Sequence, residues 1–160
     1  MTTPAPCGQC LPVIDELLAQ PFPAAATTDD TGHAGPDHKV RDLRISQDFW
    51  DDEDGQAWDQ AHADLEACLD DLTHTLTTRW GDPLAVDLWA WLTAGLNGDL
   101  NGQEVSEPVA YLSQNAMNMR AWQLPGGAHW LGLALGQADK ELPLVLYAAI
   151  GTGPVPQTPS

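Results

Sequence analysis

Two cysteines and two histidines in the first part of the chain are residue types that bind zinc. Cys7 and Cys10 form a Cys-x-x-Cys pair, and His33 and His38 are separated by four residues. Thiolate and imidazole ligands in such a set suit a tetrahedral zinc ion. The gap of 22 residues between Cys10 and His33 is longer than the roughly 12–15 of the zinc-finger pattern. Two interpretations stay open: a zinc site, or a terminus with incidental thiols and imidazoles.

A second metal motif is incomplete. Residues 97–102, NGDLNG, match the first half of a calcium loop, with oxygen donors at alternate positions and a glycine at the sixth. The last position of that loop requires glutamate and here holds Pro108. Two Asn-Gly turns therefore explain the segment without a metal.

Residues suited to acid–base catalysis are few. Asp87 lies near two tryptophans in a predicted strand, where a dry pocket would raise the pKa of its carboxyl group. His129 is the only histidine on a predicted strand. The serines lie outside Gly-x-Ser-x-Gly, and His-Glu-x-x-His and phosphate-binding loops are absent. We expect a non-enzymatic protein without a cofactor, and an Asp87/His129 site in a small ligand-binding domain or enzyme is the alternative.

The charge distribution is strongly one-sided. The chain has 23 acids, six bases and a formal net charge of −17. Between Arg44 and Arg79 there is no lysine or arginine, and ten acids lie there. Such a surface repels nucleic acid and anionic lipid, and it attracts basic protein surfaces. A host whose proteins are generally acidic is the other explanation.

A long amphipathic helix is predicted over residues 55–80. At 100° per residue its apolar side chains fall on one arc, and the acids Asp64, Glu66, Asp70 and Asp71 fall on the other side. Asp54 is expected as the N-cap, and Gly81 with Pro83 ends the helix. A short apolar segment, Leu11 to Leu18, has helical spacing but is too short to be stable alone. It must dock on the domain or stay disordered.

Four strands are predicted after the long helix, over residues 84–92, 118–124, 128–135 and 142–150, with a short helix over 106–114. The expected fold is α+β, with one long helix packed on a four-stranded antiparallel meander in two layers. Residues 1–19 form a short N-terminal segment, 20–39 a flexible linker, 40–150 the single domain and 151–160 a disordered tail.

The sheet face away from the long helix is predicted to be aromatic. It would carry Trp89, Trp91, Trp122 and Trp130, together with Tyr147. A soluble domain with one covering helix normally shows polar residues there. An additional layer must hide this face, and it could be the segment 11–18, a second copy of the chain or a partner.

These patterns favour an acidic protein-binding domain that holds a basic or apolar protein partner, as inhibitor, immunity, adaptor or chaperone proteins do. The four tryptophans Trp89, Trp91, Trp122 and Trp130 are the expected anchors, because aromatic residues concentrate binding energy. The acids Asp64, Glu66, Asp70 and Asp71 are the expected steering charges. A homodimer is a further possibility. The chain begins without a signal-peptide pattern, so a cytoplasmic location is expected.

Overall fold

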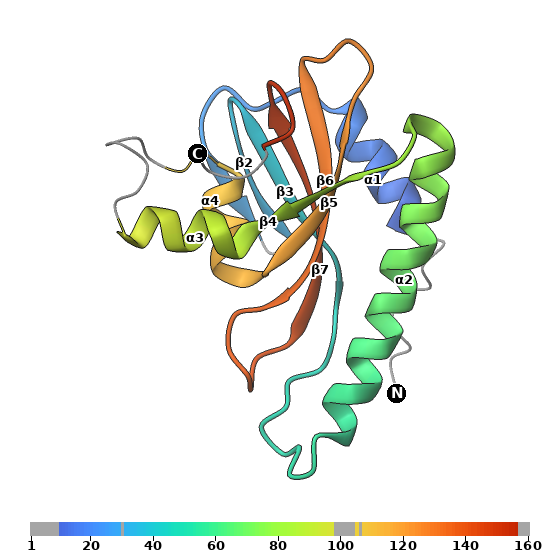
Figure 1. Cartoon of the computed structure of the whole chain (residues 1–160), viewed down its shortest axis with the longest axis vertical. Helices are drawn as coiled ribbons and strands as arrows, with labels where there is room; N and C mark the ends of the chain where they lie inside the picture. Colours follow the sequence, from blue (N-terminus) through green and yellow to red (C-terminus); the bar gives the residue numbers. More distant parts are fainter. Residues whose placement is uncertain (1–9, 30, 98–104, 106, 157–160) are drawn as a thin grey trace.

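The computed structural model describes residues 10–29, 31–97, 105 and 107–156. They form one seven-stranded antiparallel sheet with helices on both faces (Figure 1). The α+β class and the antiparallel sheet confirm the sequence prediction. The prediction of four strands and one covering helix is wrong, because the described part of the chain has seven strands and four α-helices in three layers.

The strand order is β1-β2-β3-β7-β6-β5-β4. The strands are β1 (Thr27–Asp29), β2 (Gly32–Gly35), β3 (His38–Ile45), β4 (Leu84–Asp87), β5 (Asn118–Gln123), β6 (His129–Gln137) and β7 (Leu144–Thr152). β3 pairs with β7, so the N-terminal hairpin extends the C-terminal meander. The two edge strands, β1 and β4, are short, and short edges give little template for pairing with another chain.

Three of these strands come from residues predicted to be a linker or left unassigned. β1, β2 and the start of β3 lie within residues 20–39, which are rich in Pro, Gly, Thr and Asp. β1 is exposed along its whole length, so its sequence lacks the apolar alternation that marks a strand. Tertiary pairing with β3 and β7 therefore decides the structure of this segment.

The helix α2 (Gln56–Trp80) confirms the long amphipathic helix. Its N-cap is Gly55, not Asp54, and Gly55 has a left-handed backbone with φ of 78°. Nearby carboxylates still satisfy the first amides: Asp52 accepts from the amides of Ala57 and Trp58 at 3.2 and 3.0 Å. At the other end Gly81 is the C-cap, as predicted, and its N–H donates to the Thr77 carbonyl.

The short helix α1 (Cys10–Ala19) packs beside α2 on the same sheet face (Figure 1). Ile14 and Leu17 are buried there, and the thiols of Cys10 and Cys68 lie 4.0 Å apart. The Arg79 guanidinium binds both carboxylate oxygens of Asp15, at 2.7 and 3.3 Å. The segment 11–18 therefore docks on the domain.

The second sheet face is covered by the chain itself. The helices α3 (Leu88–Asn97) and α4 (Val109–Asn115) lie on the face opposite α2. The sequence predicted a strand through residue 92, but the strand ends at Asp87, whose carboxylate accepts from the Ala90 amide at 3.1 Å and starts α3. The apolar residues at positions 88, 91 and 92 fit the spacing of a helix as well as the residues from 84 to 92 fit the alternation of a strand.

Alternation along the central strands creates two cores. In β6, Leu131 and Leu133 face α2, while Trp130 and Ala134 face α3 and α4, as predicted. The prediction that Trp122 shares the face of Trp130 is wrong. Trp122 pairs with Leu131 and packs under α2, where its indole N–H donates to the Gly81 carbonyl at 3.0 Å.

Candidate functional site

The four predicted tryptophan anchors are not on one surface. Trp122 and Trp130 are 2% and 3% exposed, so neither offers an indole to a partner in this conformation. Trp91 is half-buried on α3 and Trp89, on the same helix, is 52% exposed. Trp130 is buried by α3 and α4, which cover the face that the sequence left open, whereas Trp122 is buried on the other face under α2.

The four predicted steering acids all lie on the exposed side of α2. Asp70 is paired with Arg120, with 2.8 Å between the Oδ1 and Nη1 atoms. Glu66 lies 3.6 Å from Nδ1 of His62, and Asp64 accepts a hydrogen bond from Gln60. Asp71 is also exposed. The acidic face is therefore present as predicted, with Asp70 partly neutralised by its partner.

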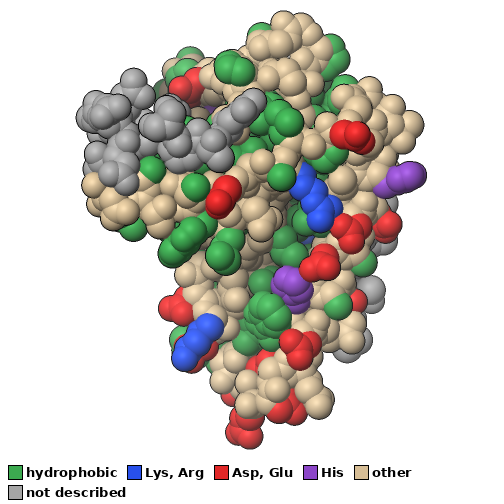
Figure 2. Space-filling model, viewed as in Figure 1, with side chains coloured by type: hydrophobic (Ala, Val, Ile, Leu, Met, Phe, Trp, Pro, Cys, Tyr) green, Lys and Arg blue, Asp and Glu red, His purple; other side chains and the backbone are tan. Residues whose placement is uncertain are grey.

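A groove lies between α2 and the end of β6, and we call it the α2–β6 groove. It has a volume of about 380 Å³. Figure 2 shows hydrophobic side chains in the hollow between α2 and the sheet, with acidic side chains along α2 and at the lower end. The groove is lined by Trp58, His62, Glu66, residues 115–118, residues 135–137 and Leu144.

The helical wall of the α2–β6 groove repeats every four residues along α2. The Trp58 and His62 rings stack with centroids 4.8 Å apart, and Glu66 follows one turn later. The Trp58 indole N–H donates to Oε1 of Gln137 at 3.1 Å, which holds the ring against the end of β6. On the opposite wall Met117 is 64% exposed. The groove thus combines apolar side chains with polar ones, and Glu66 supplies a carboxylate to its lining.

A second hollow of about 510 Å³ continues from the first, because Trp58 and Gln137 line both. Phe49 is buried at its base and Trp50 is 63% exposed. Sequence reasoning assigned Trp58 only to the apolar face of the long helix and assigned Trp50 no position. One signal in the sequence could have identified Trp50. It stands next to a run of acidic residues, where a large aromatic side chain is not expected to be part of the core.

A cluster of two histidines and a glutamate lies on the α3/α4 side of the β2–β3 hairpin. One ligand atom from each of His33, His38 and Glu107 lies within 4.8 Å of the others. The His33 ring packs edge-on against Tyr111 at 4.5 Å. The pKa of His33 is lowered, chiefly by burial and then by His38, while Glu107 acts in the opposite direction. Sequence reasoning missed Glu107, which is distant in the chain.

The four-residue zinc set predicted from the sequence is not brought together. Cys10 is buried in the core under α2, on the sheet face opposite His33 and His38. Cys7 lies outside the described residues, as does most of the predicted calcium loop. The two histidines alone are brought together by the structure, and their rings are 5.5 Å apart.

The alternative Asp87/His129 site is not formed either. Asp87 pairs with Asn118 at one end of β5, whereas His129 bonds to Leu124 just beyond the other end. A strand of that length separates them by about 20 Å. Asp87 caps α3, and the His129 ring packs against Phe22 at 5.2 Å. Each side chain therefore has a local structural role.

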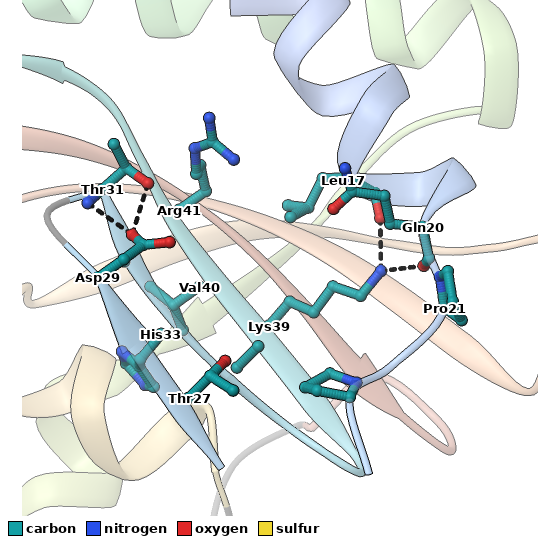
Figure 3. Close-up of a pocket in the computed structure, with 13 residues that line it drawn as sticks. Leu17, Gln20, Pro21, Thr27, Asp29, Thr31, His33, Lys39, Val40 and Arg41 are labelled. Carbon is teal, nitrogen blue, oxygen red and sulfur yellow. Dashed lines mark hydrogen bonds between the residues drawn. The ribbon is translucent and has the colours of Figure 1, made fainter. Parts of the chain in front are cut away.

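A third hollow, of about 210 Å³, lies between the end of α1 and the β1–β2–β3 edge (Figure 3). The Lys39 ammonium is buried and donates to the carbonyls of Leu17 and Gln20. Asp29 accepts from both the amide and the hydroxyl of Thr31 at 2.7 Å. The Lys39 ammonium and the Asp29 carboxylate, which both line this hollow, are thus bonded to groups of the chain itself. Figure 3 also shows His33 directed away from Arg41, toward the other face.

Comparison of the chain with protein-family models, curated proteins and solved structures gives no significant match. Among the described residues, no helix combines the length and the apolar character that crossing a membrane requires.

Proposed function

We propose that this chain is a non-enzymatic protein-binding domain, and that its α2–β6 groove holds a basic segment of a protein partner. The segment inserts an apolar side chain between Trp58 and Met117 and places its cations near the carboxylates of α2. The observation that carries this proposal is an open groove in which the exposed side chain of Met117 and the ring of Trp58 lie together with the carboxylate of Glu66.

The apolar part of the α2–β6 groove supplies the anchor. Trp58 is half-buried and is held in place by Gln137 and His62, so little conformational entropy is lost when a side chain packs on it. Met117 is flexible and exposed, and methionine adapts its shape to an inserted group. Binding energy in interfaces concentrates at such aromatic positions.

The acidic part determines the sign of the partner's charge. Glu66 lines the groove, and Asp64 and Asp71 are exposed elsewhere on α2. Asp52 and Glu141 line the neighbouring hollow together with Lys140. With a net charge of −17 this surface attracts lysine and arginine and repels a second copy of the chain. Charge complementarity thus favours a basic partner over a homodimer. An inhibitor or immunity protein, an adaptor and a chaperone all fit this mode of binding.

The probe for this proposal is a library of short peptides in which lysines and arginines flank a single Leu, Phe or Trp. Binding followed by amide chemical shifts should perturb residues around Trp58, Met117 and the end of β6. Affinity should fall about tenfold between low and high salt, because exposed charge pairs are screened. Shifts that cluster elsewhere, or an affinity that salt leaves unchanged, contradict the proposal.

Two matched pairs of variants separate the groove from general effects. Met117→Ser should weaken peptide binding, while Leu96→Ser changes an even more exposed apolar residue on α3 and should not.

The second pair changes charge. Asp64→Asn with Glu66→Gln should slow association and flatten its salt dependence. The control, Glu16→Gln with Asp82→Asn, removes the same charge at exposed positions away from the groove. Equal effects of the two charge variants would mean that net charge alone, and not the groove, attracts the peptide.

A further inference from the structure

The β2–β3 hairpin places His33 and His38 on the same sheet face. His33 pairs with Val40 and His38 pairs with Gly35, so the two histidines are diagonal neighbours across the hairpin. Gly35 gives the His38 ring its space, because a Cβ at this position would lie 2.8 Å from the ring carbon Cε1. Glu107, just before α4, reaches the pair, with 3.9 Å between its Oε2 and Nε2 of His33.

Neighbouring groups orient both imidazoles. Nδ1 of His38 lies 2.8 Å from Oδ1 of Asp37, which leaves the other ring nitrogen, Nε2, available as a ligand atom. The His33 ring is held edge-on against Tyr111, which in turn packs at 90° on Tyr147. Burial raises the pKa of the Tyr147 phenol, so the ring that packs behind Tyr111 stays uncharged. A carboxylate bonded to a ligating histidine, with packing behind the ligands, is typical of protein metal sites.

We propose that His33, His38 and Glu107 bind one zinc ion, with water as the fourth ligand. Two imidazoles and one carboxylate form a ligand set that zinc uses in sites with an open position. Imidazole ligands also disfavour magnesium and calcium, which prefer oxygen. The site is distinct from the cysteine-containing set that the sequence suggested, since Cys10 lies on the other face of the sheet.

The distances require only a small rearrangement. Zinc–ligand bonds of about 2.0–2.1 Å place tetrahedral ligands roughly 3.4 Å apart. The His33–Glu107 pair is 3.9 Å apart, and all three ligand atoms lie within 4.8 Å of one another. The histidine side chains are 20% and 12% exposed and the Glu107 side chain is 39% exposed. Glu107 can therefore move toward the two fixed rings, and the open side admits the ion and a water molecule.

The test uses the full chain without a polyhistidine tag, titrated with Zn²⁺ by calorimetry and with Co²⁺ by visible spectroscopy. We expect one ion per chain, the absorption of tetrahedral cobalt, and a rise in melting temperature with zinc. Loss of an orienting neighbour alone costs about 10–100-fold in affinity, so His33→Ala, His38→Ala and Glu107→Gln should each cost at least about 100-fold.

Two controls make the result decisive. His74→Gln removes an exposed histidine of α2 and should leave the affinity unchanged. Cys7→Ser should also leave it unchanged, and zinc lost with Cys7→Ser but kept in the histidine variants would overturn the proposal. So would binding of less than one ion per chain, or binding that His74→Gln weakens as much as Glu107→Gln does. Circular dichroism of the isosteric Glu107→Gln variant separates loss of the ion from loss of the fold.

Discussion

Lys39 is the buried charge that fixes α1 to the sheet, and Lys39→Met tests this role. Lys39 is 4% exposed, and its ammonium donates to the carbonyls of Leu17 and Gln20 at the C-terminal end of α1. It also lies 5.0 Å from the centre of the Phe22 ring. Methionine keeps most of the apolar stem but cannot donate, so the two carbonyls lose their partner.

The expected cost follows from these contacts. A hydrogen bond from a charged group contributes about 1.5–3 kcal/mol. A cation at a helix C-terminus adds about 0.3–1 kcal/mol. Two such bonds, less the desolvation of the ammonium that methionine avoids, give a net loss of about 2–3 kcal/mol in the free energy of unfolding. For a chain of this size that corresponds to a fall in melting temperature of about 4–12 °C.

Urea unfolding and hydrogen exchange measure the effect of Lys39→Met. Exchange should accelerate most in α1, because its docking depends on this cap. Lys140→Met is the matched control: Lys140 is exposed, so its loss should change stability by less than about 0.5 kcal/mol. Equal denaturation midpoints for the two variants would refute the assignment of Lys39 as the anchor of α1.

Three further substitutions test the cores and the sheet. Asp42 has a buried Oδ1 without a hydrogen-bond partner among the described residues, and burial raises the pKa of its carboxyl group. The folded state therefore binds this proton more tightly than the unfolded state, and the ionised carboxylate destabilises the fold above its folded-state pKa. Asp42→Asn should stabilise by about 1 kcal/mol at pH 7. The gain should shrink as the pH falls below the folded-state pKa and vanish below the ordinary pKa of an aspartate carboxyl; urea midpoints across pH check both. Cys68→Ser should destabilise by about 1–3 kcal/mol in the same assay, because it places a hydroxyl group in the apolar core against Cys10. Gly136→Ala should reduce thermal stability strongly, since its Cβ would lie 2.0 Å from the Asn115 carbonyl oxygen, and an unchanged melting temperature would show that residues 115–117 move aside freely.

The parts of the fold that sequence reasoning predicted are those with a strong local period. α2 carries apolar residues at the helical spacing, and β6 and β7 are runs of mostly apolar residues of strand length, in which the leucines of β6 stand at every second position. Leu131 and Leu133 could be assigned to one face for this reason. Local spacing also gave Gly81 as the end of α2, because glycine adopts the positive φ of 89° found there.

The parts that it missed depend on contacts distant in the chain. β1 and β2 have no apolar alternation, and β4 is followed by a helix whose residues also alternate. The identity of the layer over Trp130 could not be derived, because nothing local marks α3 and α4 as its cover. The same holds for Glu107, which is brought to His33 only by the placement of α4 against the hairpin.

By itself the sequence determined the acidic surface of α2 and the amphipathic character of the helix, because both follow from residue types at a fixed spacing. The tertiary structure alone decided which aromatic residues are buried and which are available. Trp122 and Trp130 became core because adjacent strands point them to opposite faces, each covered by its own helices. Trp58 became a groove wall because the first turns of α2 lie beside the start of β5, where the groove lined by Trp58 and Asn118 leaves one side of the helix open.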